Sequence, residues 1–324
     1  MKAIRLTQKI SVEDLEPGSY KRPDVKPGYA LIKVKAFGVN ESEVTSRKGE
    51  SSSDFSFPRI LGIEGVGVIE ETSSNSNYQT GQQVATMMEG LGRSVDGSYA
   101  EYMLVKEDNL IPFKSSLPWE VLGAIPEMVQ TAYGSLTTGL QIKEGETLFI
   151  HGGTSTVGLT AAVLAKSMGV TVIATSRKVE KLDILKKYGV KHAILDDENY
   201  FSHVKKIVPE GVDKVLEFIG TDVVPQDMKL LKKAGKLCFT GALNNKWAFD
   251  NFSPYCIPSG TFFTSYAGGV SDFPSQVMDQ IIKKIENKEI EIPIAKVYDG
   301  LESVKEAQTN LESGKFIGKH VVVL

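Results

Sequence analysis

The feature that most constrains the fold of this chain is a regular alternation of strand-like and helix-like segments between Thr147 and Tyr266. The strand-like runs, rich in β-branched and aromatic residues, are TLFIHG, VTVIATS, HAILD, KVLEFI, KLCFTG and TFFTSY. The amphipathic segments between them include TVGLTAAVLAKSMG, KVEKLDILKKYG, YFSHVKKIV and DVVPQDMKLLKKAG. Apolar strands separated by helices of this length are typical of a parallel sheet covered on both faces. The pattern therefore predicts an α/β fold with a doubly wound parallel sheet.

The remainder of the chain has a different pattern of apolar and turn-forming residues. Up to about residue 120, short apolar runs such as YALIKVKAFGV and GVGVIEE are separated by turn-forming Pro-Gly and Ser-rich segments, which predicts a mostly β domain. After Tyr266 come two helix-like segments and a terminal apolar run, GKHVVVL. Because 324 residues exceed the usual size of a single core, we expect two domains. Residues 1–121 and 267–324 would form the first, and residues 122–266 the second.

The first turn of the alternating region, IHGGTSTVG, lies between a predicted strand and a predicted helix. Such a turn binds a pyrophosphate because free N–H groups and the positive end of the helix dipole converge there. Ser155 and Thr156 stand where the fingerprint G-x-G-x-x-G would lead one to expect a further glycine, and their hydroxyl groups could cap the helix or contact phosphate. We expect dinucleotide contacts from Gly152, Ser155, Thr156, Val157 and Gly158. A flavodoxin-like or methyltransferase-like sheet with another nucleotide is the alternative.

The end of the second strand bears on which dinucleotide would bind. An acidic residue there would take the adenosine ribose hydroxyls and select NAD. This chain instead has Ser176 and Arg177, with Lys181 one turn further on. Hydroxyl and cationic groups suit the 2'-phosphate of NADP, since a guanidinium can bind phosphate with two hydrogen bonds. These residues predict NADP(H) as the cofactor.

Composition disfavours several other classes of protein. The net charge of -3 disfavours nucleic-acid binding, which needs concentrated Lys and Arg. The chain has neither an N-terminal segment of signal-peptide type nor an apolar run long enough to cross a membrane, so we expect no membrane partner and a cytoplasmic location. Cys238 and Cys256 lack the paired spacing of a zinc ribbon, and we expect both to be free thiols.

Over essentially its full length, the chain resembles the medium-chain dehydrogenase/reductase superfamily, and it is most similar to the zinc-free quinone oxidoreductase branch. The segments that carry the resemblance are VKAFGVNESEVTSRKG, ILGIEGVGVIEE, GSYAEYMLV, TAYGSL, the glycine turn and GKHVVVL. The resemblance implies a GroES-like catalytic domain joined to a Rossmann domain.

The motifs for zinc are incomplete in this chain. Zinc-dependent members have a cysteine where this chain has Asn40, and a His-Glu pair where it has Ile63 and Glu64. Ile63 has no ligand atom, and the cysteines of the family's structural zinc lobe are absent from the sequence. We therefore expect no metal.

The resemblance also implies roles for individual residues. The residue matching Asn40 lies near the nicotinamide, and Thr45 stands where a tyrosine is common, so both are candidates for the substrate pocket. Residues matching Thr131, Gly241, Phe262 and Phe263 contact the cofactor. A tyrosine that meets the 2'-phosphate in relatives is replaced near Asp197. The sequence identifies no catalytic acid or base.

The function implied is NADPH-dependent hydride transfer to a small molecule, either a quinone or an α,β-unsaturated carbonyl compound. Without zinc, the acceptor must be activated by conjugation or by hydrogen bonds. Two alternatives remain open: an enoyl-thioester reductase, and a non-catalytic NADPH-binding sensor or structural protein. Relatives pair through the edge strands of their cofactor domains, so a homodimer is expected.

Overall fold

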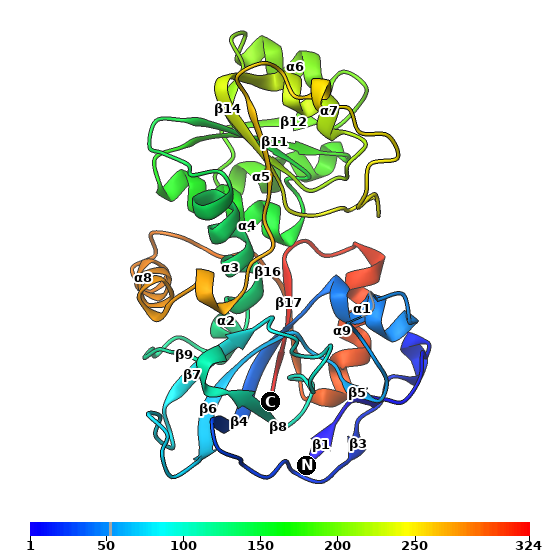
Figure 1. The fold of residues 1–324 in the computed structure, drawn as a ribbon, viewed down its shortest axis with the longest axis vertical. Coiled ribbons are helices and arrows are strands. Elements are labelled where there is room, and N and C mark those ends of the chain that lie inside the picture. Colours follow the sequence, from blue (N-terminus) through cyan, green and yellow to red (C-terminus); the bar gives the residue numbers. More distant parts are fainter. Residues whose placement is uncertain (52–53) are drawn as a thin grey trace. The chain divides into compact units, whose positions relative to one another are not determined.

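The computed structural model describes residues 1–51 and 54–324, which divide into two compact units (Figure 1). Unit 1 consists of Met1–Gln130, Gly269–Asn287 and Ile294–Leu324. Unit 2 consists of Thr131–Gly268 and Lys288–Pro293. The boundaries therefore differ slightly from the expected 122–266. Residues 122–130 lie in unit 1, whereas residues 267–268 and 288–293 lie in unit 2, and the first boundary falls inside the helix Pro126–Gly134.

Unit 1 is built around a mostly antiparallel sheet with the order β16-β17-β4-β6-β7-β9, and β8 also pairs with β4. Its strands are β4 (Tyr29–Val39), β6 (Glu64–Thr72), β7 (Gln83–Met87), β8 (Tyr102–Lys106), β9 (Ile111–Pro112), β16 (Ile294–Asp299) and β17 (Lys319–Val323). Short strands β1 (Lys2–Ala3), β2 (Arg5–Leu6), β3 (Gly18–Ser19) and β5 (Arg59–Ile60) form two further ladders. The terminal run GKHVVVL thus supplies a strand beside β4, with His320 opposite Val39.

The helices of unit 1 are amphipathic or short. They are α1 (Glu41–Lys48), α2 (Trp119–Leu122), α8 (Ser275–Glu286) and α9 (Val304–Ser313), together with the first part of α3 (Pro126–Gly134). Helix α1 begins directly after β4 and ends at Gly49, whose φ of 74° gives the left-handed cap that glycine favours. The core of this unit includes Phe37 and Tyr99, which stack with ring centroids 4.7 Å apart.

Unit 2 contains the parallel sheet that the alternating pattern predicts, in the order β12-β11-β10-β13-β14-β15. The strands are β10 (Thr147–His151), β11 (Thr171–Ser176), β12 (His192–Leu195), β13 (Val212–Glu217), β14 (Leu231–Phe239) and β15 (Phe262–Ser265). The helices are α4 (Thr156–Ser167), α5 (Leu182–Lys187), α6 (Tyr200–Ile207) and α7 (Val224–Asp227). Strands β10 and β13 are neighbours at the point where the strand order reverses, which is where open α/β sheets bind ligands.

One predicted helix is largely replaced by other structure. DVVPQDMKLLKKAG yields only α7 and a 3-10 turn, Met228–Leu230, before β14 begins at Leu231. Met228, Leu230 and Leu231 have a spacing compatible with a helix, but they are buried in the core of unit 2 around β13 and β14. Tertiary packing here decides between two readings of a short apolar run.

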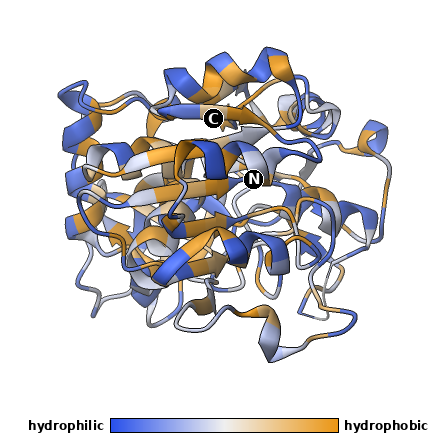
Figure 2. Ribbon diagram, turned by 90° about the horizontal axis from the view of Figure 1, so that it is seen from above, coloured by the Kyte–Doolittle hydropathy of each residue, from blue (hydrophilic) through white to orange (hydrophobic). Residues whose placement is uncertain are grey.

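Several helices carry hydrophilic and hydrophobic residues on different sides (Figure 2), as helices that pack one face against a core do. Cys238 is buried and Cys256 half-buried, and both are free thiols, as predicted. Within residues 1–51 and 54–324, the structure contains no helix of the length and apolar character that a membrane span requires.

Candidate functional site

The glycine turn of unit 2 is shaped by both glycines and hydroxyl groups. Gly152 follows β10 with a φ of 90°, in the left-handed region that favours glycine. Ser155 is the N-cap of α4: its Oγ accepts a hydrogen bond from the Gly158 N–H at 3.1 Å and donates one to the Gly152 carbonyl at 2.9 Å. Of the two roles open to the Ser155 hydroxyl, the structure shows helix capping.

Gly158 is tightly confined. A Cβ at this position would lie 2.7 Å from the Gly152 carbonyl oxygen and 2.8 Å from Ser155 Oγ, both closer than real Cβ contacts. The same is true of Gly153, where a Cβ would lie 2.7 Å from the Cβ of Ala174 on β11. Glycine is therefore required for this turn to close against its own helix and the adjacent strand.

The first turn of α4 retains donors for a ligand. The first N–H groups of a helix have no acceptor within the helix. Ser155 takes the N–H of Gly158, whereas the N–H groups of Thr156 and Val157 have no acceptor in the described part of the chain. Both residues are partly exposed. The helix has 12 residues, so its dipole adds to the preference of this end for an anion.

The end of β11 carries a group of cationic side chains. Ser176 is buried, and its hydroxyl donates to the Lys178 carbonyl at 2.9 Å and accepts from the Lys178 N–H at 3.1 Å, so it closes the turn. Arg177 and Lys178 are exposed. Burial lowers the pKa of Lys181, and the charges of Lys178 and Arg177 lower it further.

The other predicted cofactor residues of unit 2 lie on several elements. Thr131 is in α3, and its carbonyl accepts a hydrogen bond from the Ser135 hydroxyl at 2.7 Å. Gly241 follows β14 and is partly exposed. Phe262 and Phe263 are in β15, where Phe262 is exposed and Phe263 packs against the core. Their contact with a cofactor remains a prediction.

A buried charged cluster lies next to the glycine turn, and the sequence did not reveal it. His151, the last residue of β10, faces a carboxylate on each ring nitrogen: Asp227 Oδ2 lies 2.7 Å from Nδ1, and Asp196 Oδ1 lies 3.1 Å from Nε2. Tyr200 donates its hydroxyl to Asp227 Oδ1 at 2.8 Å. Burial lowers the pKa of His151, but the charge of Asp227 and the bonds to both carboxylates raise it more, to about 10. The imidazole is therefore protonated at neutral pH.

Glu217, the last residue of β13, is the direct cross-strand neighbour of His151. Its Oε1 accepts hydrogen bonds from the N–H groups of Ile219 and Gly220, while its buried Oε2 has no partner among the described residues. Burial, followed by the charge of Asp227, raises the pKa of Glu217 to about 8. A polar residue at the carboxyl end of an apolar strand is the sequence signal that could have indicated both His151 and Glu217.

His151, Glu217 and Asp227 offer ligand atoms within 4.8 Å of one another, which is a spacing compatible with a metal ion. Both nitrogens of His151, however, face carboxylates and both need hydrogens, so the imidazolium already supplies the positive charge of the cluster. A metal ion would have to displace a proton from a group whose pKa is raised to about 10. The donor set therefore favours protons over a metal ion.

A second buried cluster lies in unit 1 and contains Asn40, the predicted substrate-pocket residue. The Lys319 ammonium donates to Asn40 Oδ1 at 2.5 Å and Glu127 Oε2 at 2.9 Å, and it lies 2.6 Å from Glu64 Oε1. Asn40 Nδ2 donates to Glu64 Oε1 at 2.9 Å. An ammonium group has three N–H bonds, and each has an acceptor here. Burial lowers the pKa of Lys319, but the charges of Glu127 and Glu64 raise it by more than burial lowers it. The pKa is therefore raised overall, and the ammonium group stays charged.

Glu43 extends this cluster from α1. Its carboxylate accepts hydrogen bonds from the N–H groups of Asn40 and Ile63, both at 2.8 Å. Burial and the nearby charge of Glu64 raise the pKa of Glu43 to about 7, although the bond from Ile63 opposes this rise. Burial also raises the pKa of Glu64. Lys319, which begins the terminal strand before His320 and three valines, was the sequence signal for this cluster.

Thr45, the other candidate for the substrate pocket, is partly buried, and its hydroxyl donates to the Glu41 carbonyl at 2.8 Å within α1. Arg47 is buried and links α1 to α9 through Gln308 at 2.8 Å and Glu312 at 2.6 Å. These bonds give Arg47 a structural role.

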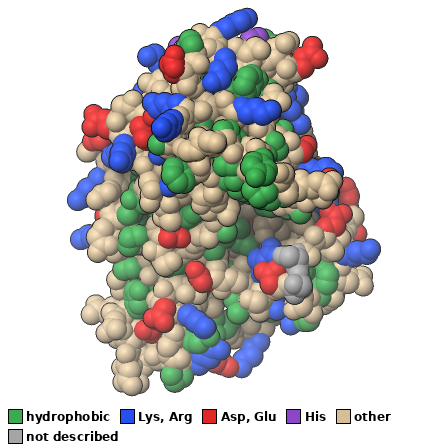
Figure 3. All heavy atoms as spheres, turned by 45° about the horizontal axis from the view of Figure 1, so that its top comes forward, with side chains coloured by type: hydrophobic (Ala, Val, Ile, Leu, Met, Phe, Trp, Pro, Cys, Tyr) green, Lys and Arg blue, Asp and Glu red, His purple; other side chains and the backbone are tan. Residues whose placement is uncertain are grey.

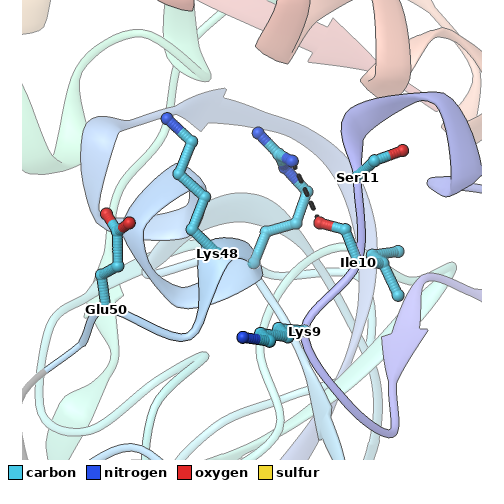
Figure 4. Close-up of a pocket in the computed structure, with 6 residues that line it drawn as sticks. Lys9, Ile10, Ser11, Lys48 and Glu50 are labelled. Atoms are coloured by element: carbon cyan, nitrogen blue, oxygen red, sulfur yellow. Dashed lines mark hydrogen bonds between the residues drawn. The ribbon is translucent and has the colours of Figure 1, made fainter.

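The surface of unit 1 has an open hollow beside α1, lined by Lys9, Ile10, Ser11, Arg47, Lys48 and Glu50 (Figure 4). The Arg47 guanidinium donates to the Ile10 carbonyl at 3.2 Å across it. None of the predicted site residues lines this hollow, and we assign no function to it. On the face drawn in Figure 3, positive and negative side chains are interspersed.

Comparisons with known proteins agree with this architecture. Residues 26–115 match the family model described as "Alcohol dehydrogenase GroES-like domain", and residues 156–283 match "Zinc-binding dehydrogenase". A quinone oxidoreductase of Pongo abelii is 31% identical over 223 residues, which are 68% of this chain and 66% of that protein. The human quinone oxidoreductase is 30% identical over the same length. The chain thus aligns with slightly less than two thirds of these curated relatives.

Solved structures share the fold along the whole chain. The quinone oxidoreductase of Pseudomonas syringae pv. Tomato DC3000 has a TM-score of 0.86 at 21% identity, and the match covers 100% of this chain and 99% of that one. At this identity the likeness concerns the fold alone. The two family models, the curated relatives and the two-unit fold together establish that the chain belongs to the medium-chain dehydrogenase/reductase family.

Proposed function

We propose that this protein is an NADPH-dependent oxidoreductase that delivers hydride to a quinone or an α,β-unsaturated carbonyl compound without zinc. The observation that carries the proposal is the glycine turn, where the N–H groups of Thr156 and Val157 have no acceptor among residues 1–51 and 54–324. Arg177 and Lys181 follow one strand later. The likeness to quinone oxidoreductases supports the reaction class.

The residues at the family's zinc positions do not fit a zinc ion. Ile63 is buried and has no ligand atom. Asn40 and Glu64 both bond to the Lys319 ammonium, so the place already contains a cation. The "Zinc-binding dehydrogenase" description of the matching family model therefore does not extend to zinc chemistry in our proposal.

NADPH is the cofactor that the cationic groups after β11 favour. The exposed guanidinium of Arg177 suits a 2'-phosphate, and the charge crowding at Lys181 would be relieved by a dianion. A mycobacterial protein of similar fold was solved in complex with NADPH. The two chains match with a TM-score of 0.85 at 22% identity, and the match covers 100% of both. That likeness is one of fold, and the assignment to this chain rests on Arg177 and Lys181.

When bound, the reduced nicotinamide supplies the hydride. In the proposal, Thr156 and Val157 bind the pyrophosphate through their N–H groups, and Arg177 with Lys181 binds the 2'-phosphate. Hydride addition to the β-carbon of an enone places negative charge on the carbonyl oxygen, and water or a weak acid can protonate the product. A strong dedicated acid is therefore not required, which suits a chain whose sequence identifies none.

We also propose that the protein forms a homodimer through β15. This strand pairs with β14 along one edge, and Phe262 is 55% exposed there. An exposed apolar edge strand is a ready surface for pairing. Sedimentation analysis of the wild-type protein and of Phe262→Lys would test this, since a monomeric wild type would refute it.

The experiment that tests the function follows the oxidation of NADPH and NADH with a panel of quinones, enals, enones and enoyl thioesters. Turnover of quinones or enones with NADPH supports the proposal. Turnover of enoyl thioesters alone would assign the protein to that reductase class instead. Tight NADPH binding without turnover of any acceptor would refute the enzymatic role and favour a cofactor sensor.

A further inference from the structure

Glu217 and His151 end the two strands that flank the reversal of strand order in unit 2. They are register partners in the parallel pair β10 and β13, so their side chains lie on the same face of the sheet. Gly152 follows His151 directly, and the segment Phe218–Gly220 follows Glu217. The two residues therefore lie beneath the two loops that meet where a dinucleotide binds in such sheets.

The Glu217 carboxyl group shapes its own loop. Oε1 accepts hydrogen bonds from two consecutive N–H groups, those of Ile219 and Gly220, and Gly220 has a φ of 155°. The loop in turn packs against the glycine turn, because a Cβ on Gly152 would lie 3.2 Å from Ile219 Cδ1 and 3.2 Å from Phe218 Cβ. The Phe218 N–H also donates to the His151 carbonyl at 3.1 Å, which joins the two segments directly.

The other oxygen of Glu217 lies in an unusual environment. Oε2 is buried and has no hydrogen-bond partner in the described chain, and the residue is 0% exposed. The charged groups that act on Glu217 are Asp227 and the His151 imidazolium. His151 also faces Asp196, and Asp227 accepts a hydrogen bond from the Tyr200 hydroxyl. The His151 imidazolium already faces two carboxylates, those of Asp196 and Asp227. An ionised Glu217 would add a third negative charge to this cluster, and a proton on Glu217 avoids that charge.

We propose that Glu217 is a positioning residue for the dinucleotide: its Oε1 holds the loop 218–220 against the glycine turn, and the anionic dinucleotide binds more tightly when this carboxyl group is protonated. The inference rests on the proposed function only in requiring that unit 2 binds a nicotinamide dinucleotide. Glu217 acts through the loop and does not contact the reacting atoms. Because the pyrophosphate is anionic, its binding beside this cluster favours the neutral carboxyl group.

The sign of the pH dependence follows from this linkage. Burial and the charge of Asp227 raise the pKa of Glu217 to about 8 in the free protein, although the hydrogen bonds from Gly220 and Ile219 and the charge of His151 oppose this rise. Above this pH the free protein loses the proton, and cofactor binding must restore it. The dissociation constant for NADPH should therefore rise between pH 7 and 9, by about three- to tenfold, since one proton gives at most tenfold per pH unit.

The test measures the dissociation constants of NADPH and NADH by fluorescence between pH 7 and 9, for the wild type, Glu217→Gln and Glu146→Gln. Glutamine mimics the protonated carboxyl group, so E217Q should bind as the wild type does at pH 7 and should keep that affinity to pH 9. Glu146 lies just before the opposite end of β10, beside Lys214, and E146Q should retain the wild-type pH profile. The profile should be the same with NADH, whereas titration of Lys181 would affect NADPH alone.

Equal pH profiles for the wild type and E217Q would overturn the inference while leaving the proposed cofactor intact. Absence of dinucleotide binding by the wild type would overturn both. Circular dichroism should establish that E217Q is folded; if it is not, Glu217→Asp provides the second variant. Aspartate keeps the titrating group but shortens its reach, so E217D should bind more weakly at pH 7 and still lose affinity as the pH rises. A pH-independent E217D would contradict the inference.

Discussion

The Lys319 ammonium lies 2.5 Å from Asn40 Oδ1, so the C-terminal strand of unit 1 fixes the side chain that follows β4. Only the amide oxygen can accept from an ammonium, which determines the orientation of the Asn40 amide and turns Nδ2 toward Glu64. Asn40, which we predict to lie near the nicotinamide, is therefore held by a charged group 279 positions away in the sequence.

Lys319→Met should destabilise unit 1 strongly. The substitution removes the cation shared by Asn40, Glu64 and Glu127, and removing one partner of a buried ion pair costs about 3–5 kcal/mol. Urea unfolding would measure the loss. The control is Lys296→Met on the adjacent strand β16, whose exposed pair with Glu306 should contribute less than about 1 kcal/mol. Similar losses for both variants would contradict the buried cluster.

The stability of the protein should fall as the pH rises through the range in which Glu43 titrates. The pKa of Glu43 is about 7 in the folded state, against about 4.3 when unfolded, so the folded state binds more protons between these values. Ionisation of Glu43 therefore costs stability from about pH 4.3 up to about pH 7. Glu64, whose pKa is also raised, acts in the same direction.

Unfolding of the wild type and of Glu43→Gln at pH 5.5 and 7.5 would test this dependence. Glutamine does not titrate, so the stability of E43Q should change less between the two pH values. Glutamine has one acceptor oxygen fewer for the N–H groups of Asn40 and Ile63, and this loss lowers the stability of E43Q equally at both pH values. A pH dependence equal to that of the wild type would show that Glu43 is ionised throughout.

Arg177→Ala should weaken NADPH binding about tenfold and leave NADH binding nearly unchanged, because a hydrogen bond to a charged group contributes about 1.5–3 kcal/mol. Titration calorimetry with both dinucleotides measures the difference. Lys186→Ala on α5 is the control, since its ammonium is exposed and pairs with Asp183. Equal effects of R177A on NADPH and NADH would refute the role given to this guanidinium.

Gly158→Ala should reduce the affinity for either dinucleotide, because the added methyl group would lie 2.7 Å from the Gly152 carbonyl oxygen and must displace the turn. Ala165→Gly on the same helix is the control. It should weaken α4 by about 1 kcal/mol without touching the turn. If G158A binds NADPH as the wild type does, the turn is not the phosphate site.

The periodicity of the sequence was sufficient to predict the parallel sheet of unit 2, because apolar strands and amphipathic helices follow local rules. It was less informative at Leu231, where a spacing typical of a helix became the start of β14 through burial in the core. The glycine turn could be predicted for the same local reason, because the Ser155 hydroxyl bonds to Gly152 and Gly158 within the turn itself.

The sequence by itself therefore determined the strands and helices of the parallel sheet, the phosphate-type turn and the missing zinc ligands. Each of these depends on residues that are close together in the chain. Only the tertiary structure decided the two buried clusters. His151 meets Asp227 across 76 positions, and Lys319 meets Asn40 across 279. Such pairs form because a buried charge needs a partner, and which partner it finds depends on which strands the fold brings side by side.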